Sequence, residues 1–207
     1  NETCGSLAIE RLVGQLDSTN LVFTAPTVEG TSAKDTITGS ALAEIIYGLD
    51  GNDRINGGAG ADVIIDGAGA DRLNGGDRSD ISLWTDNHQN DDVFRYLSSE
   101  DSYRTDSQSF ADLIEGFTVD DRIDVTALGY SGFGEGTGTT LELVYNTELD
   151  RTYLRDVEAD AQGHWFQVAL AGDWRESLDE DHMIFAPDAE IGLVGVAPEV
   201  DPGHLLT

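Results

Sequence analysis

The sequence repeats itself every nine residues between Gly30 and Leu83. Three consecutive windows read almost alike: GLDGNDRIN, GGAGADVII and DGAGADRLN, at residues 48–56, 57–65 and 66–74. Weaker copies flank them at residues 30–38, 39–47 and 75–83. Glycine favours positions one, two and four, an acid holds position six, and position eight is aliphatic in every window except the last. A fixed short period of this kind predicts a coil of stacked units, each of which contacts its neighbours.

Each window has the composition of a tight turn followed by a very short strand. Glycines at positions two and four permit positive φ, so the chain can wrap closely around an ion. The turn exposes carbonyl groups and position six adds a carboxylate, and hard oxygen ligands suit calcium better than zinc or copper. The pattern predicts a right-handed parallel β-roll that binds several calcium ions. A glycine-rich flexible linker is the alternative, but a linker needs no regular acid or aliphatic position.

Since one full coil takes two windows, acids eighteen residues apart stack on the same side of the coil. The expected columns are Asp35, Asp53 and Asp71 on one side, and Glu44, Asp62 and Asp80 on the other. Adjacent strands lie about 4.8 Å apart, and two carboxylates at about 5 Å repel by roughly 3 kcal/mol. Several such pairs exceed the stability of a small domain. We therefore expect the roll to be disordered without calcium and to fold when calcium binds.

The three residues that follow each acid define an interior and two outer faces. Position eight points inward and forms one apolar column, Ile37, Ile46, Ile55, Ile64 and Leu73. Positions seven and nine point outward. One face is polar, with Thr36, Thr38, Arg54, Asn56, Arg72 and Asn74; the other is apolar, with Ile45, Tyr47, Val63, Ile65, Ile81 and Leu83. An exposed apolar sheet is unusual, so we expect a cover from residues 21–28 or from the C-terminal part.

Arg54 and Arg72 are expected one coil apart on the polar face. They either pair with nearby aspartates or form a ladder for a polyanionic polymer, in which arginine forks meet repeated carboxylates. Asn56 and Asn74 beside them could donate to sugar hydroxyls.

The formal net charge is −29, from 40 acids and 11 bases. Phosphates would be repelled, so nucleic acid is not an expected partner; the acids point to metal cations, with plain solubility as the alternative. The single cysteine, Cys4, excludes an intramolecular disulfide. We expect no membrane insertion, because no apolar run approaches a membrane span. No basic-then-apolar secretory signal is present, so an extracellular protein would need another export route or a longer chain.

Beyond Leu83 the period is lost. WTDNHQN at 84–90 interrupts it, and DDVFRY resumes the rhythm with Asp92 and Phe94 at positions six and eight. Later segments read as strands of an antiparallel sheet that closes the end of the roll. The expected division is an N-terminal segment or linker at 1–29, a calcium-binding roll at 30–95, a C-terminal β cap at 96–185 and a mobile tail at 186–207.

Two parts of the sequence carry a resemblance. The nonapeptides resemble those of RTX proteins, which are exported by type I systems. The stretches DDVFRYLSSEDSYRTDSQSFADLIEGF, DRIDVTALGYSGFGEG and RTYLRDVEADAQGHWFQVALAGD resemble the regulatory module of bacterial mannuronan C5-epimerases, over roughly residues 30–185. The chain departs from that pattern at WTDNHQN, at GGDRSDISL and in its first 29 residues.

The resemblance implies a secreted, non-catalytic module that binds calcium and alginate beside a catalytic module of the same polypeptide. Its implied calcium ligands are the carboxylates of Asp53, Asp62, Asp71 and Asp80, with Asp35 and Glu44 as weaker candidates. The turn glycines that it implies are Gly48, Gly51, Gly57, Gly60, Gly67 and Gly69. Its implied alginate contacts are Arg54, Arg72 and Arg95. A structural and secretion module that folds on extracellular calcium without binding polysaccharide is the alternative.

The four scattered histidines form no acid–base motif, and His164 is expected to be structural. Tyr103 and Arg104 are either loop-stabilising groups or sugar contacts.

Overall fold

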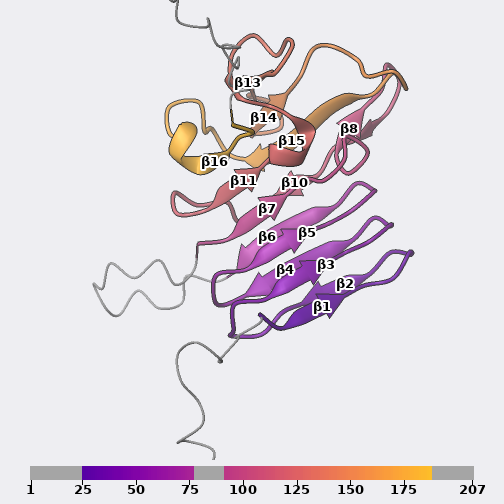
Figure 1. Cartoon of the computed structure of the whole chain (residues 1–207), viewed down its shortest axis with the longest axis vertical. Helices are drawn as coiled ribbons and strands as arrows, with labels where there is room; N and C mark the ends of the chain where they lie inside the picture. Colours follow the sequence, from indigo (N-terminus) through magenta and orange to yellow (C-terminus); the bar gives the residue numbers. More distant parts are fainter. Residues whose placement is uncertain (1–24, 77–90, 188–207) are drawn as a thin grey trace, which may run out of the picture.

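The computed structural model describes residues 25–76 and 91–187. Cys4, Asp80, Ile81, Leu83 and the segment WTDNHQN lie outside these ranges, as does most of the segment expected to be a mobile tail. The described chain is a stack of coils with a larger β layer at the end opposite β1 (Figure 1).

One wall of the stack is sheet A, whose six strands lie in the order β1-β3-β5-β7-β11-β16 and pair in parallel. The strands are Thr27–Glu29 (β1), Ile45–Tyr47 (β3), Val63–Ile65 (β5), Val93–Arg95 (β7), Arg122–Asp124 (β11) and Met183–Ile184 (β16).

The facing wall is sheet B, with the order β12-β13-β14-β15-β10-β6-β4-β2. Its parallel part holds Thr36–Thr38 (β2), Arg54–Gly58 (β4), Arg72–Gly76 (β6), Leu113–Ile114 (β10) and Trp165–Ala171 (β15). Thr140–Asn146 (β13) and Arg151–Arg155 (β14) continue it in antiparallel fashion from β15, and Gly132–Phe133 (β12) pairs with β13. A hairpin of Tyr103–Arg104 (β8) and Ser109–Phe110 (β9) joins the start of β15.

Two apolar columns fill the space between the sheets. On sheet B the register places Ile37, Ile55, Leu73, Ile114 and Leu170 one above another. On sheet A it does the same for Ile46, Ile64, Phe94, Ile123 and Met183. Every one of these side chains is buried. The expected all-β architecture, a parallel roll of nonapeptides with an antiparallel region at its C-terminal end, is confirmed. The position-eight side chains point inward as predicted, but they form two columns, one on each sheet, because successive windows alternate between the sheets, and the predicted single column is wrong.

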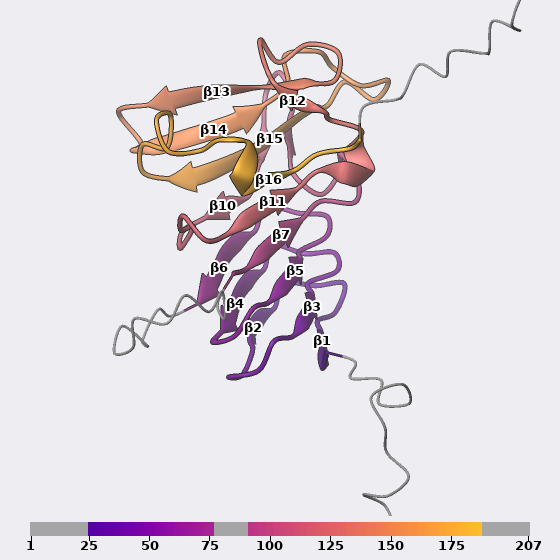
Figure 2. The same ribbon diagram turned by 60° about the vertical axis from the view of Figure 1, so that its left-hand side comes forward.

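The interior changes where the repeats end. Within the repeats, each strand contributes one aliphatic side chain to the core between the sheets. C-terminal to the repeats, aromatic rings fill the core. Tyr96 lies edge-on to Phe166 with ring centroids 5.5 Å apart, and Phe117 packs between Phe94 and Trp174. Figure 2 shows the antiparallel strands β13, β14 and β15 spreading beyond the narrow stack. The two short 3-10 helices, Thr126–Leu128 (η1) and Glu180–His182 (η2), also lie in this part of the chain.

The turns have the backbone that the repeat predicts. Positive φ occurs at position two in Gly58 (106°) and Gly67 (85°), and at position four in Gly51 (152°) and Gly60 (111°). Leu49 holds position two of its window with φ 73°, where a side chain is strained.

The parallel ladder extends past both expected limits of the roll. Thr27–Glu29 pairs with β3 as the first strand of sheet A, so these residues extend the edge of the apolar sheet and do not cover its outer face. At the other end β10, β11 and β16 continue the parallel pairing far beyond Arg95. Because the parallel pairing crosses residues 30 and 95, the pairing does not mark a boundary there. The division of the chain at residues 30, 95 and 185 stays a prediction. Within the described ranges, no helix is long and apolar enough to cross a membrane.

Candidate calcium turns and polar sheet face

The acids form two columns, one along each row of turns. In each column the carboxylate of one acid accepts a hydrogen bond from the backbone N–H of the acid on the preceding coil. In the first column Asp53 Oδ1 accepts from the backbone N–H of Asp35 at 2.8 Å, and Asp71 Oδ1 accepts from Asp53 at 2.6 Å. Asp112 Oδ1 then accepts from Asp71 at 2.8 Å. One oxygen of each aspartate thus ties its own coil to the coil below.

The second column repeats this arrangement along sheet A. Asp62 Oδ1 accepts from the backbone of Glu44 at 2.8 Å, Asp92 Oδ1 from that of Asp62 at 2.9 Å, and Asp121 Oδ1 from that of Asp92 at 3.1 Å. Among the described residues Asp92 therefore takes the place after Asp62, and Asp80, the expected third member of this column, lies outside them. Asp92 follows Asp62 because β7, which begins one residue later, is the strand that pairs with β5.

The second carboxylate oxygens indicate a cation. Oδ2 of Asp53, Asp62, Asp71 and Asp112 is buried and has no hydrogen-bond partner among the described residues. A buried, unpaired carboxylate oxygen costs several kcal/mol unless a proton or a cation compensates it. The oxygens lie in rows, as a series of divalent ions between successive turns requires. The donor set fits calcium, which binds carboxylate and carbonyl oxygens together.

The glycines at position one leave room beside these oxygens. A Cβ at Gly30 would lie 2.6 Å from the carbonyl oxygen of Gly48 and 3.1 Å from Asp35 Oδ2. One at Gly48 would crowd the Asp66 carbonyl oxygen and Asp53 Oδ2, and one at Gly57 would overlap Asp62 Oδ2. Carbonyl and carboxylate oxygens therefore converge at each of these turns.

The remaining predicted glycines serve the turns in two ways. Gly51, Gly60 and Gly67 supply positive φ, and a Cβ at Gly69 would overlap the carbonyl oxygen of Gly51 on the neighbouring coil. All six predicted glycines thus lie in the turns that carry the acids, and these turns would hold the calcium. Bound calcium would neutralise the stacked carboxylates.

Burial changes the protonation of the acids. Desolvation raises the pKa of Asp62 to about 6, and the pKa values of Asp71 and Asp92 to about 7. The same cause raises the pKa values of Asp66 and Asp112 well above the ordinary range. Without a cation, the charged form of these side chains is disfavoured.

A cluster of three buried carboxylates stands out where the repeats meet the aromatic core. Oxygens of Asp66, Asp71 and Asp112 lie within 4.8 Å of one another. Asp66 takes position one of its window, where the other two strong repeats have glycine. The Tyr96 hydroxyl interacts electrostatically with all three acids and is itself buried without a hydrogen-bond partner among described groups. The sequence reasoning missed Asp66, although its departure from the repeat was visible.

Asp92, Asp112 and Asp121 were absent from the predicted ligand set, yet one signal finds all three. Each begins an acid–x–apolar triplet, DVF, DLI or DRI, like the DRI, DVI and DRL of the repeats. The triplet persists after the nine-residue period is lost. Asp80 lies outside the described residues.

The outer face of sheet B brings four of the five predicted alginate contacts together. Arg54 is the register partner of Arg72, and Asn56 that of Asn74. Both arginines reach the same carboxylate, Glu115 of the segment after β10; Arg54 Nη1 is 3.8 Å from it and Arg72 Nη2 hydrogen-bonds to it. The first of the two interpretations thus holds in part, with a glutamate in place of an aspartate. The two arginine side chains remain 61% and 51% exposed.

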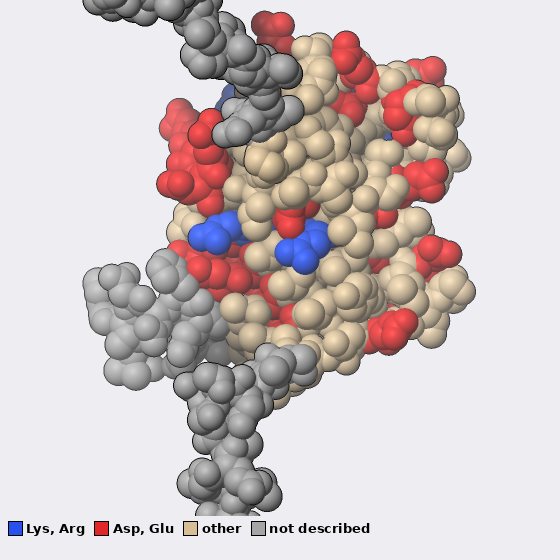
Figure 3. All heavy atoms as spheres, viewed as in Figure 1, with Lys and Arg blue, Asp and Glu red and all other residues tan. Residues whose placement is uncertain are grey.

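Arg95, the fifth predicted contact, lies elsewhere. It belongs to β7 of sheet A, and its Nε donates to Asp124 Oδ2 at 2.7 Å. Grouping it with Arg54 and Arg72 is therefore wrong, because β7 pairs with β5 and not with β6. In the view of Figure 3 the blue side chains form two small groups at the level of β7 and β11, with acids toward both margins.

Comparison with known proteins adds three findings. The RTX calcium-binding nonapeptide repeat matches residues 47–81 in four copies. Alginate lyase 7 of Azotobacter vinelandii is 51% identical over 174 residues, which cover 84% of this chain and 20% of that protein. Mannuronan C5-epimerase AlgE4 of the same organism is 50% identical over 95 residues, or 45% of this chain and 17% of that protein. The chain spans at most a fifth of the length of these two relatives.

Two solved structures match over nearly their full length. The AlgE6R3 subunit of the Azotobacter vinelandii mannuronan C5-epimerase has 38% sequence identity and a TM-score of 0.60, covering 86% of this chain and 98% of its own. The AlgE6R2 subunit has 34% identity and a TM-score of 0.62, covering 81% and 96%. The architecture of the coils and of the closing β layer is shared with both subunits.

Proposed function

This chain belongs to the family of RTX calcium-binding repeat modules that includes the R subunits of mannuronan C5-epimerase, and on that basis we propose that it is the calcium-folded accessory module of a secreted alginate-modifying enzyme. It binds the alginate chain and presents it to a catalytic module of the same polypeptide, and it carries no reaction itself. RTX repeats are typical of secreted proteins exported by type I systems, which supports the extracellular location.

The activities named for the relatives support alginate as the ligand. They include both epimerases and a lyase, so the shared element is the polymer and not one reaction. The catalytic partner is accordingly an alginate-acting module, and a C5-epimerase is the partner that we propose.

The observation that carries the proposal is the exposed cationic strip on sheet B. Arg54 and Arg72 lie in register on neighbouring strands, and Arg151 is close enough to lower the pKa of Glu115 together with them. Two arginines therefore pair with one carboxylate, and a third cation acts on it electrostatically, on a chain of net charge −29. An exposed ion pair contributes only about 0–1 kcal/mol, so carboxylates of a polyuronate can replace Glu115. Asn56 and Asn74 lie beside the strip as partners for sugar hydroxyls.

The test is calorimetric titration of calcium-loaded protein with oligomannuronate. The double variant Arg54→Gln/Arg72→Gln should bind about tenfold more weakly, since each exposed pair contributes up to about 1 kcal/mol. The matched control is Arg122→Gln/Arg175→Gln, which removes the same charge from exposed arginines on β11 and in the loop after β15. Affinity should also fall as salt rises, because the attraction is local and screened.

Equal losses in the two double variants would contradict a specific strip. Absence of binding to any uronate polymer would favour the alternative, a structural and secretion module that folds on extracellular calcium. That alternative rests on the same calcium turns and makes no use of the strip.

A further inference from the structure

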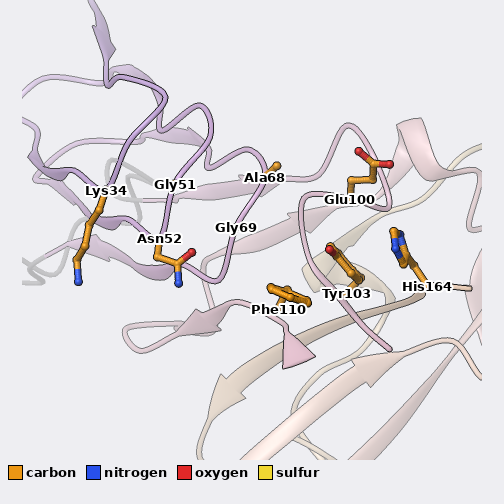
Figure 4. A pocket seen from close by; sticks show the side chains of 9 residues that line it. All are labelled: Lys34, Gly51, Asn52, Ala68, Gly69, Glu100, Tyr103, Phe110 and His164. Carbon is orange, nitrogen blue, oxygen red and sulfur yellow. The ribbon is translucent and has the colours of Figure 1, made fainter. Parts of the chain in front are cut away.

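A pocket lies between the turns of the roll and the hairpin of the closing β layer. Its volume is about 560 Å³, within the usual range for small-molecule sites. One wall consists of the turn residues Gly51, Asn52, Ala68 and Gly69, with Lys34 from the turn before them. The other wall consists of Glu100, Tyr103, Phe110 and His164. Figure 4 shows the side chains in a row, from Lys34 and Asn52 through Phe110 and Tyr103 to His164.

Three rings form a continuous stack in this pocket. The rings of Tyr103 and Phe110 have centroids 4.9 Å apart and an angle of 29° between planes, because the two residues face each other across β8 and β9. His164 stacks on Tyr103 at 4.0 Å and 26°, since it precedes the residues of β15 that pair with β8. All three rings are half-buried. They offer apolar surface to solvent on a strongly acidic protein. Because exposed rings do not improve solubility, this surface points to a binding role.

The polar groups around the rings restrict the chemistry of a ligand. Lys34 provides an exposed ammonium and Asn52 an exposed amide with donors and an acceptor. Glu100 provides an exposed carboxylate, which accepts from hydroxyls and repels dense negative charge. A ligand that matches the ring stack, the ammonium, the amide and the carboxylate has an apolar ring face, hydroxyl groups and a single carboxylate per ring. A uronic acid has this composition, whereas a phosphate-rich ligand would meet Glu100.

We propose that this pocket is a subsite for one or two uronate residues of an acidic polysaccharide, with a sugar ring against the outer face of Phe110 at the end of the ring stack, hydroxyls on Asn52 and Glu100, and a carboxylate on Lys34. The inference rests on the proposed function and adds a second contact region to the strip. The two regions are adjacent in the chain, because Asn52 lies in the turn that leads into β4 and precedes Arg54 by two residues. A single polymer can therefore touch both.

The pocket is also linked to the calcium turns. Gly51 and Gly69 pair as neighbouring turns, and the same turns contain Asp53 and Asp71. Calcium that orders these turns also builds this wall of the pocket. By thermodynamic reciprocity, an oligouronate bound there should raise calcium affinity by the factor by which calcium raises oligouronate affinity.

The experiment titrates a trimannuronate into calcium-loaded protein, with binding followed by NMR. Phe110→Leu keeps an apolar side chain but removes the ring, and Lys34→Gln removes the charge at an exposed site. Each should weaken binding by about threefold to tenfold. Ring protons of Phe110 and Tyr103 should shift on binding. Lys34→Gln should leave the weak binding of a neutral trisaccharide unchanged.

Matched controls separate the subsite from general effects. Phe133→Leu removes a half-buried ring that packs on Phe185 at 5.5 Å, outside the pocket, and Arg175→Gln removes an exposed cation. Both should bind trimannuronate like the parent protein. Thermal midpoints in calcium verify that each variant is folded, and Lys34→Gln provides a test that does not disturb packing.

The outcomes distinguish the two proposals. If Phe110→Leu and Lys34→Gln bind as tightly as the controls while Arg54→Gln/Arg72→Gln is weakened, the subsite is wrong and the proposed function stands. If the pocket variants are weakened and the strip variant is not, the subsite stands and the strip is wrong. If neither trimannuronate nor longer polymer binds, both proposals fail.

Discussion

The repeat turns and the closing β layer differ in how they satisfy buried polar groups. In the closing layer the protein supplies several of the partners itself, although Arg104 Nε and Asp156 Oδ1 are buried without a hydrogen-bond partner among the described residues. Thr152 Oγ1 donates to the Gly172 carbonyl and accepts from Trp174 N–H, both at 2.8 Å. Ser102 Oγ donates to the Gln167 carbonyl and accepts from Asp112 N–H.

In the turns, one oxygen of each linked aspartate has a backbone partner, while the other is left without one in four cases that include Asp53 and Asp71. We therefore expect a cation from outside the chain to complete the polar groups of the roll. The closing layer is stabilised by ordinary packing and hydrogen bonds. The predictions below test this difference, beginning with the largest expected effect.

Calcium removal should produce the largest difference in stability between the roll and the closing layer. In EGTA we expect amides of β2 to β6 to lose their protection from hydrogen exchange, because repulsion between stacked carboxylates is no longer compensated. Amides of the β13–β14 hairpin should keep more of theirs. Exchange measured by NMR, together with thermal melts in EGTA and in millimolar calcium, gives the comparison. Identical midpoints and identical protection in both media would show that the roll needs no cation.

Neutralising one acid should lower the free energy of unfolding in calcium but not in its absence. In calcium, Asp71→Asn should lower the free energy of unfolding by about 3 kcal/mol, since it leaves a buried ion with an incomplete ligand set. In EGTA the same change should be neutral or stabilising, because it removes a buried charge. Chemical denaturation in both media measures the effect.

The control for this change is Asp35→Asn at the half-exposed start of the same column, where Asp35 Oδ2 already accepts from Thr31 N–H at 2.6 Å. Its effect should be about 1 kcal/mol or less in calcium. A loss at Asp35 as large as that at Asp71 would argue against the dependence on burial.

The calcium-free protein should become less stable as pH rises. The folded pKa of Asp62 is about 6 and those of Asp71 and Asp92 are about 7, above the ordinary 3.8, so the folded state binds protons more tightly than the unfolded chain. Stability from this source is complete below the ordinary value and is lost as pH rises through about 6 to 7.

Thermal midpoints in EGTA should therefore fall between about pH 5 and about pH 8. In calcium the trend should reverse, because protons compete with the metal for the same carboxylates. A flat profile in EGTA would mean that these acids are not desolvated in the folded protein.

Leu49→Gly should have the smallest effect, and a stabilising one. Leu49 holds φ 73° at a turn position where Gly58 and Gly67 are the equivalents. Relief of the left-handed strain should raise the free energy of unfolding by about 1 kcal/mol at most, offset in part by the flexibility of glycine. Leu42→Gly, in a turn without positive φ, should instead be slightly destabilising. Denaturant midpoints in calcium are sufficient to compare the two variants.

Particular residues show how far local pattern extends. Ile37, Ile55 and Leu73 were placed correctly in one buried column, because a strict period of nine carries register without any knowledge of the rest of the chain. Asp80 was assigned where Asp92 stands, since the step from Asp62 to its partner is 30 residues and no longer 18. The step from Asp71 to Asp112 is 41 residues, so no fixed period predicts it.

The arginines show the same limit at the surface. The pairing of Arg54 with Arg72 follows from the repeat, but their common partner Glu115 comes from the segment after β10, which lies outside the repeats. Arg95 was grouped with them by residue type, and its strand turned out to belong to the other sheet.

The sequence by itself determined the coil, its inward side chains, the turn glycines and the oxygen-rich chemistry of the turns, because each depends on residues within one or two windows. The tertiary structure alone decided which acids complete the columns, which carboxylate faces the arginines and that Phe110, Tyr103 and His164 stack beside Asn52. The physical reason is that these contacts join strands separated by loops of unequal length. Their register is set by how the coils and the closing layer pack together, and no local spacing encodes it.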